Sequence, residues 1–163
     1  MSTICHDALA RIAVLDLDGW AGLPTCTLVD VEAVWRPSEA AGRPVALGRE
    51  TAEAHHFDTG SGWVRVWSRD GTVVLIDVDG PLEVDVAALG EPDAHVMAHV
   101  GFASYPDGEL VFAARGLAVG VAPESGVVVY AAVFAPCSAD DYTARLQVDR
   151  KQRPIPMGGA HGL

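Results

Sequence analysis

Turn signals at short intervals are the feature that most constrains the fold of this chain. From Trp63 onward, apolar runs are separated by Asp-Gly, Asp-Gly-Pro, Pro-Asp-Gly and Arg-Gly segments and by a final turn that begins with Pro and ends with Gly. Such segments favour the tight connections that join neighbouring antiparallel strands. The runs between them predict strands at residues 63–67, 72–78, 97–105, 109–114, 117–122 and 127–135. The pattern therefore predicts an antiparallel meander.

The last of these runs is the most apolar segment of the chain. Alternation along an extended strand predicts two sets of side chains on opposite faces. One face would carry Val128, Tyr130, Ala132 and Phe134, and the other Val127, Val129, Ala131 and Val133. Because both sets are apolar, we expect this strand to be central in the sheet and covered on both faces.

Helical signals lie near both ends of the chain. Apolar residues at helical spacing predict a first helix over residues 3–13, although residues 12–17 also fit a strand. Ser138 is a good N-cap, and the following Asp140 and Asp141 would lie in the first helical turn, where negative charge is favourable. These signals predict a final helix that begins after Ser138.

The remaining segments complete the predicted organisation. Residues 28–35 alternate as a strand does, residues 36–48 are typical of a loop, and residues 84–89 predict one or two helical turns. We expect one domain over residues 1–149 and a flexible or partner-docked tail over residues 150–163. The predicted fold class is α+β, with a single curved antiparallel sheet and a few packed helices.

The charge balance limits the kinds of partner. The chain has 11 Lys and Arg residues against 22 Asp and Glu residues, which gives a formal net charge of −11. Ahead of the tail it lacks the clusters of basic residues that bind nucleic acids or anionic membranes. We therefore expect neither nucleic-acid nor membrane binding. A basic protein or a cationic small molecule is a partner more compatible with this negative charge, and the sequence allows either a homo-oligomer or a hetero-oligomer.

The richness in Ala, Gly and Arg is typical of a GC-rich bacterial genome.

Cysteine use and the start of the chain bear on location. The three cysteines, Cys5, Cys26 and Cys137, are an odd number without a close pair, which argues against a disulfide framework or a redox motif. We interpret them as small buried hydrophobes. Their spacing with the histidines fits no closed tetrahedral metal site, and we expect no cofactor.

The first residues lack the basic segment of a signal peptide, and no apolar run reaches membrane-spanning length, so the sequence predicts a cytoplasmic protein.

Four polar residues are candidates for acid–base catalysis. His56 and Asp58 would share one face of an extended segment, and so would Asp77 and Asp79. Two such groups on one face can divide the acid and base roles of a reaction. In the alternative interpretation, His56 and Asp58 belong to an exposed polar loop. Asp77 and Asp79 then belong to a solvated sheet face that ends in an Asp-Gly turn.

Three further residues are candidates for ligand binding. Arg115 is the only Lys or Arg between Asp70 and Ala144, a stretch that is rich in Asp and Glu. Its guanidinium would grip an anionic ligand, or would serve as a structural partner for nearby carboxylates, which is the reading we favour. Trp63 and Trp67 would share a strand face, either as a ligand wall or, as we prefer, as core packing.

Residues 84–147 resemble a known kind of small module. The segments LGEPDA, ELVFAARGLAVGV, VVVYAAVFAP and SADDYTARL follow one another with the order of turns, strands and helix seen in β-lactamase-inhibitor-protein-like α+β modules. This resemblance implies a helix followed by a curved antiparallel sheet, and a role in binding other proteins. It implies no catalytic residues.

Two functional hypotheses follow from the sequence. The first is a small cytoplasmic binding or accessory protein that presents an acidic sheet surface to a protein partner. The alternative is a small bacterial enzyme of specialised metabolism with a carboxylate and histidine pocket. An enzyme should bring at least two of the candidate groups together in a deep pocket, whereas a binding module should show a flat or shallow apolar patch rimmed by acidic residues.

Overall fold

The computed structural model describes residues 2–17, 26–38, 42–97, 108–122 and 125–149. Two segments discussed above fall partly or wholly elsewhere. The predicted tail over residues 150–163 lies outside the described residues, and so do residues 98–105 of one predicted strand.

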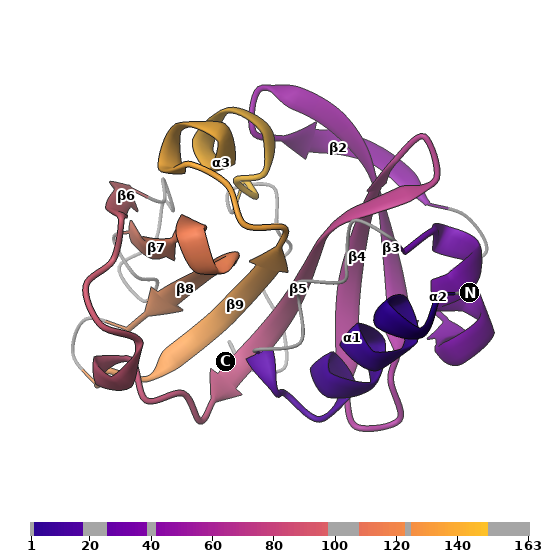
Figure 1. Cartoon of the computed structure of the whole chain (residues 1–163), viewed down its shortest axis with the longest axis horizontal. Coiled ribbons are helices and arrows are strands. Elements are labelled where there is room, and N and C mark those ends of the chain that lie inside the picture. The colour runs from indigo at the N-terminus through magenta and orange to yellow at the C-terminus, as the bar shows by residue number, and fades with distance from the viewer. Residues whose placement is uncertain (1, 18–25, 39–41, 98–107, 123–124, 150–163) are drawn as a thin grey trace, which may run out of the picture.

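In the described part of the chain nine strands form one sheet, and all of their pairings are antiparallel (Figure 1). The order across the sheet is β1-β3-β4-β5-β9-β8-β7-β6, and β2 pairs with β3 beside β1. The strands are β1 (Arg36–Pro37), β2 (Arg43–Leu47), β3 (Glu50–Asp58), β4 (Trp63–Arg69), β5 (Thr72–Leu82), β6 (Ala94–Met97), β7 (Gly108–Phe112), β8 (Leu117–Val121) and β9 (Val128–Phe134). The α+β class is therefore confirmed. The sheet consists of two meanders, β3 to β5 and β6 to β9, which join where β5 pairs with β9.

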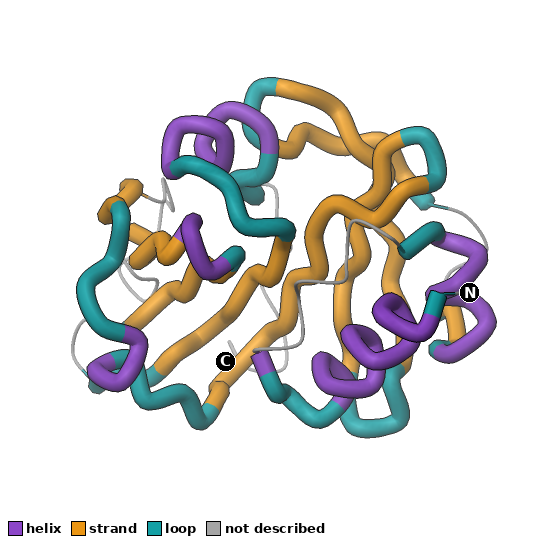
Figure 2. Tube along the Cα trace, viewed as in Figure 1, coloured by secondary structure: helices purple, strands orange, loops and turns teal. Residues whose placement is uncertain are grey.

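Three α-helices and two short 3-10 helices lie around the described part of the sheet (Figure 2). They are α1 (Thr3–Ala13), α2 (Leu28–Val34), α3 (Ala139–Arg145), η2 (Ala87–Leu89) and η3 (Ala113–Arg115). The predicted first and last helices are confirmed, and η2 lies within the predicted helical turns. The alternative strand over residues 12–17 is wrong.

Two predictions for the first half of the chain need correction. Residues 28–35 are not a strand, because Thr27 and Asp30 form a capping box that starts α2: the Thr27 side chain accepts from the Asp30 amide, and the Asp30 carboxylate accepts from the Thr27 amide. The loop predicted over residues 36–48 instead contains β1 and β2, which both pair with β3.

The core has two parts, one on each face of the sheet. On one face, Cys5, Leu9 and Ile12 of α1 and Val31 of α2 pack against alternating residues of β4, β5 and β9. On the other face, Tyr142 of α3 packs with residues of β2, β4, β5 and β9. The face that α3 covers carries the candidate site residues of β3, β4 and β5.

The strand β9 is central, as predicted, and lies between β5 and β8. Its predicted faces are only partly correct. Val128 packs in the same core cluster as Ala131 and Val133, while Ala132 packs in the opposite cluster. Pairing with both neighbours shifts register near the start of β9, and this irregularity breaks the simple alternation. Val127 is 39% exposed rather than buried.

Gly48 allows the β2–β3 turn to pack against the end of α3. It has a φ of +61°, its amide donates to the carbonyl of Gln147, and a Cβ at this position would overlap with the carbonyl of Ala144. We expect Gly48→Ala to lower the free energy of unfolding by about 2–3 kcal/mol, because it combines left-handed strain with overpacking. Urea unfolding monitored by circular dichroism measures this change.

Gly71 is the matched control for this prediction. It also has a positive φ, of +78°, but among the described residues no atom beyond its two chain neighbours lies within 4 Å of the Cβ that alanine would add. Gly71→Ala should therefore show the conformational cost alone, about 1 kcal/mol. Equal losses at the two positions would mean that contact with α3 contributes nothing.

Candidate functional site

A row of polar side chains crosses the face of the sheet that α3 covers. His56 of β3 is directly opposite Arg65 of β4, and Arg65 is directly opposite Asp77 of β5. His56 and Asp77 thus lie two strands apart, which separates their backbones by about 10 Å. Both belong to the predicted catalytic set, but a guanidinium stands between them.

Arg65 and Asp77 form an ion pair within this row. The Nη2 atom of Arg65 lies 2.9 Å from Oδ2 of Asp77, and the side chains are 15% and 0% exposed. The guanidinium carbon of Arg65 also lies 4.8 Å from the centre of the Trp67 ring, a cation–π distance. Asp77 is therefore engaged as the buried partner of Arg65, a residue that was not among the candidates.

The other predicted residues of β3, β4 and β5 differ in their partners and in their exposure. Asp58 is opposite Trp63, and its carboxylate accepts a hydrogen bond of 2.8 Å from the amide of Gly60 in the following turn. Asp79 is opposite Tyr130 of β9. Trp63 is 59% exposed, whereas Trp67 is 2% exposed. Only Trp67 has the predicted core role, and the two rings do not form one exposed wall.

Arg115 lies in η3, on a different part of the molecule. Its side chain is exposed, and Nη1 donates a hydrogen bond of 3.2 Å to the carbonyl of Leu89 at the end of η2. Next to it, the amide of Ala114 donates to the carboxylate of Asp93 at 2.8 Å. These bonds tie η3 to the segment between β5 and β6, in keeping with the structural role that we favour for Arg115.

Glu109 of β7 is a buried carboxylate that the sequence analysis did not identify. Its side chain accepts a hydrogen bond of 2.7 Å from the hydroxyl of Tyr142 and one of 3.4 Å from Nε2 of the Gln147 side chain. These bonds fasten the end of α3 to the sheet. Glu109 follows a Pro-Asp-Gly turn in the sequence and resembles an exposed strand residue, so no local signal marks its burial.

A pocket of about 240 Å³ lies beside α3. It is lined by Arg69, residues 72–74, residues 135–137, Asp141, Arg145 and Leu146. None of the predicted site residues lines it. Burial raises the pKa of the Cys137 thiol, the negative charge of Asp141 raises it further, and Arg145 acts in the opposite direction.

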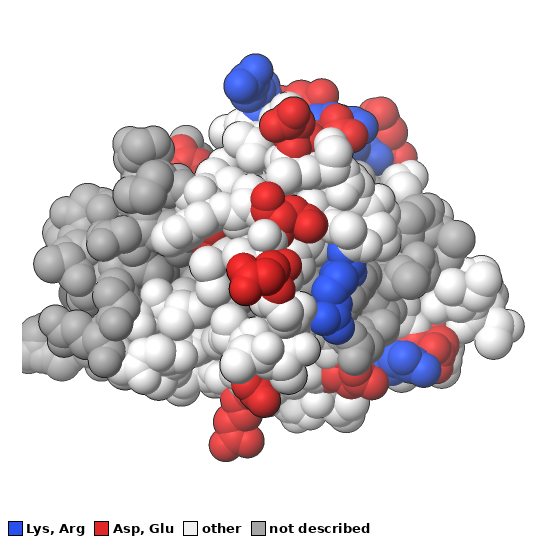
Figure 3. Space-filling view, turned by 60° about the vertical axis from the view of Figure 1, so that its left-hand side comes forward, with Lys and Arg blue, Asp and Glu red and all other residues white. Residues whose placement is uncertain are grey.

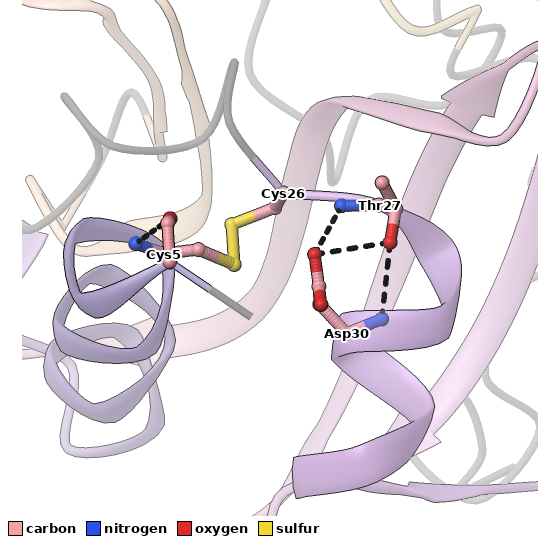
Figure 4. Close-up of a disulfide and its surroundings, with 5 residues drawn as sticks. Cys5, Cys26, Thr27 and Asp30 are labelled. Atoms are coloured by element: carbon pink, nitrogen blue, oxygen red, sulfur yellow. Dashed lines mark hydrogen bonds between the residues drawn. A yellow bond between two sulfur atoms is a disulfide. The ribbon is translucent and has the colours of Figure 1, made fainter.

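Cys5 and Cys26 form a disulfide, which corrects the expectation that no cysteines pair. Figure 4 shows the bond linking α1 to the residue just before the capping box of α2. Both cysteines are fully buried, and Cys137 is the free cysteine of the chain. The pair is separated by 21 positions in the sequence, and only the packing of α1 beside α2 brings the two residues together.

Three comparisons with known proteins gave no relative of this chain. It matches no family model, no curated protein and no solved structure. The resemblance to β-lactamase-inhibitor-protein-like modules therefore stays a prediction.

Two further observations concern only the described residues. None of the helices that the structure describes has the length and apolar character needed to cross a bilayer. Within the same part of the chain, no three His, Cys, Asp or Glu side chains are grouped so as to hold a metal ion.

Proposed function

We propose that this chain is a binding module that recognises a basic protein partner through an acidic surface. The observation that carries the proposal is a set of exposed carboxylates from the last residues of β5 to the start of β6, here called the acidic face: Asp79, Glu83, Asp85, Glu91 and Asp93. Arg115 is the one Lys or Arg between Asp70 and Ala144. Such an excess of one charge steers an oppositely charged partner and speeds its association.

Figure 3 supports this proposal. It turns the side of the molecule with η2 and β6 forward, and acidic atoms occur at several separate points on that side, with uncharged surface between them and fewer basic atoms. Non-obligate protein interfaces also combine charged and uncharged groups. We expected a curved sheet to present the acidic surface, but the acidic face lies mainly along the segment that connects β5 to β6. The curvature of the sheet stays a prediction.

The enzyme alternative has less support. Asp77 is paired with Arg65, His56 lies two strands from Asp77, and Asp58 accepts a bond from the amide of Gly60 in the adjacent turn. Acid–base catalysis needs two such groups within hydrogen-bond reach of one reacting atom. The pocket beside α3 contains none of the four predicted groups.

A cytoplasmic location is also a proposal, and one feature weighs against it. Disulfides form and persist mainly in oxidising compartments, and thiols in the cytoplasm are kept reduced. The Cys5–Cys26 disulfide therefore favours an oxidising compartment.

Charge reversal on the acidic face tests the proposed function. We expect Glu83→Lys/Glu91→Lys to lower the association rate with a captured partner by about tenfold or more, because the steering field is weakened. Both side chains are exposed, so the fold should be unchanged. The partner would be captured from a lysate of the source organism, identified by mass spectrometry and studied by surface plasmon resonance at low and high salt.

The control is Glu32→Lys/Glu53→Lys, which changes the net charge by the same amount. Glu32 lies on α2 and Glu53 on β3, and both are exposed on parts of the molecule away from η2 and β6 (Figure 1). A basic partner whose binding is lost only with the acidic-face variant supports the proposal. A partner that is not basic, or equal losses with both variants, contradicts it.

A further inference from the structure

The pocket beside α3 has a positive end that is built around Arg69 of β4. The Nη2 atom of Arg69 donates to the carbonyls of Leu47 and Arg145, and Nε donates to the carbonyl of Thr51 at 3.2 Å. The carboxylate of Glu50 lies 3.4 Å from the same Nη2 atom. The remaining nitrogen, Nη1, is buried and has no hydrogen-bond partner among the described residues.

A buried donor without an acceptor is unfavourable, and proteins usually supply an acceptor from the chain, from water or from a ligand. Arg145 lines the same pocket and carries a second guanidinium. Glu50 contacts both arginines, at 3.4 and 3.5 Å, but on the Nη2 side of Arg69. The anionic group of a ligand would therefore be received at the end of the pocket that Arg69 and Arg145 line.

The opposite charge comes from Asp141, in the first turn of α3. Its exposed carboxylate makes no ion pair within the part of the chain that the structure describes, although Arg145 lies four residues further along the helix. The carboxylate is close enough to Cys137 to influence its thiol. Apolar side chains, including Val74, Pro136 and Leu146, complete the lining. The pocket thus combines two unlike charges with an apolar wall.

We propose that this pocket binds a small zwitterion with an apolar body, of the chemical class of a free aliphatic α-amino acid. Its carboxylate would accept from Arg69, its ammonium group would face Asp141, and its side chain would pack on the apolar wall. A simple anion would be attracted by the arginines but repelled by Asp141, and a simple cation would be attracted by Asp141 but repelled by the arginines, so a zwitterion is the ligand favoured by both kinds of charge. The pocket volume of about 240 Å³ lies below that of drug-sized sites and suits a ligand of this size.

Cys137 provides a site-specific reporter of occupancy. Cys5 and Cys26 are joined in the disulfide, so the chain, which has three cysteines, has one free thiol, and that thiol lines the pocket. A bound ligand should slow its alkylation by iodoacetamide, a neutral reagent, and mass spectrometry measures the rate. The probes are valine, isobutyrate and isobutylamine, which share a branched apolar body and differ in charge.

We expect valine to protect Cys137, and the two singly charged probes to require about tenfold higher concentrations, the usual effect of losing one charged hydrogen bond. Isothermal titration with valine on the same protein gives an independent measure of binding. Failure of valine to protect or to bind, or equal protection by isobutyrate and valine, would overturn the proposal.

Asp141→Asn and Asp140→Asn form a matched pair of variants. Both residues are exposed acids in the first turn of α3, but only Asp141 lines the pocket. Asp141→Asn should lower the affinity for valine about tenfold and leave the affinity for isobutyrate unchanged or higher. Asp140→Asn should leave both affinities unchanged. Because removing the Asp141 charge lowers the pKa of the Cys137 thiol, each variant is compared with its own rate without ligand. Equal effects of the two substitutions contradict the proposal.

This inference is independent of the acidic face. The face variants carry substitutions outside the pocket, and the pocket variants leave Glu83 and Glu91 intact. Loss of partner binding with intact valine binding, or the reverse, therefore separates the two proposals.

Discussion

Arg65→Met is expected to lower the free energy of unfolding by about 3–5 kcal/mol, the usual cost of removing one partner from a buried ion pair. The substitution keeps a similar apolar stem beside Trp67 but removes the guanidinium from Asp77, whose carboxylate is 0% exposed. The carboxylate would then stay buried without its cationic neighbour, and less of its desolvation cost would be offset. Urea unfolding of both proteins measures the difference.

Two controls accompany this prediction. Arg115→Met removes an exposed arginine that donates to the carbonyl of Leu89, and we expect it to cost less than about 1 kcal/mol. Arg65→Met/Asp77→Leu replaces the whole pair with apolar side chains and should recover most of the lost stability. If Arg65→Met is no more harmful than Arg115→Met, the ion pair is not an essential part of the sheet.

Removing the disulfide is expected to have the second large effect. Cys5→Ala/Cys26→Ala should lower the free energy of unfolding by about 3 kcal/mol, because the bond closes a loop between residues that are 21 positions apart and so restricts the unfolded chain. Loss of the buried sulfur atoms adds to this value, since both cysteines lie in the core shared by α1 and the sheet. Urea unfolding and a count of free thiols are the measurements.

Cys137→Ala is the control for this experiment, because it removes a cysteine without breaking a crosslink. It should change the stability by less than about 1 kcal/mol, as expected for a half-buried residue outside any network. The native protein should contain one free thiol, and unfolding in the presence of a reductant should expose three. Three free thiols in the native protein, or equal effects of the two variants, would disprove the crosslink.

Local signals in the sequence predicted several elements correctly. The bounds of α1 follow from apolar spacing, the start of α3 from Ser138, and the β4–β5 hairpin from Asp70-Gly71, where both residues have a positive φ. α2 was misjudged because its residues alternate as a strand does. The capping box at Thr27 and Asp30 was the available signal, and it outweighs the alternation.

Register explains why the ion pair was missed. The hairpin closes with Arg69 opposite Thr72, and an unbroken ladder from that point would put Arg65 opposite Ile76. A register shift between Trp67 and Ser68 moves the pairing by one residue, so Arg65 faces Asp77. A bulge of this kind depends on how the whole sheet packs, and the residues of the turn do not encode it.

The pocket and the disulfide were missed for a related reason. The lining of the pocket comes from the end of β4, the start of β5, the segment after β9 and one side of α3. Each of these segments looks ordinary alone, and only the pairing of β5 with β9 brings them together. Cys5 and Cys26 likewise become neighbours only when α1 packs beside α2.

The β5–β9 pairing also has a consequence for how the chain folds. Each meander pairs strands that follow one another in the chain, which costs less loop-closure entropy than pairing strands that are far apart in sequence. The two meanders become one sheet only when β5 meets β9, and the segments from η2 through β8 lie between these strands in the chain. Non-local pairing of this kind slows folding. Until it occurs, β5 and β9 each have an edge of unpaired backbone N–H and C=O groups. Before this joining step the chain is therefore most exposed to self-association.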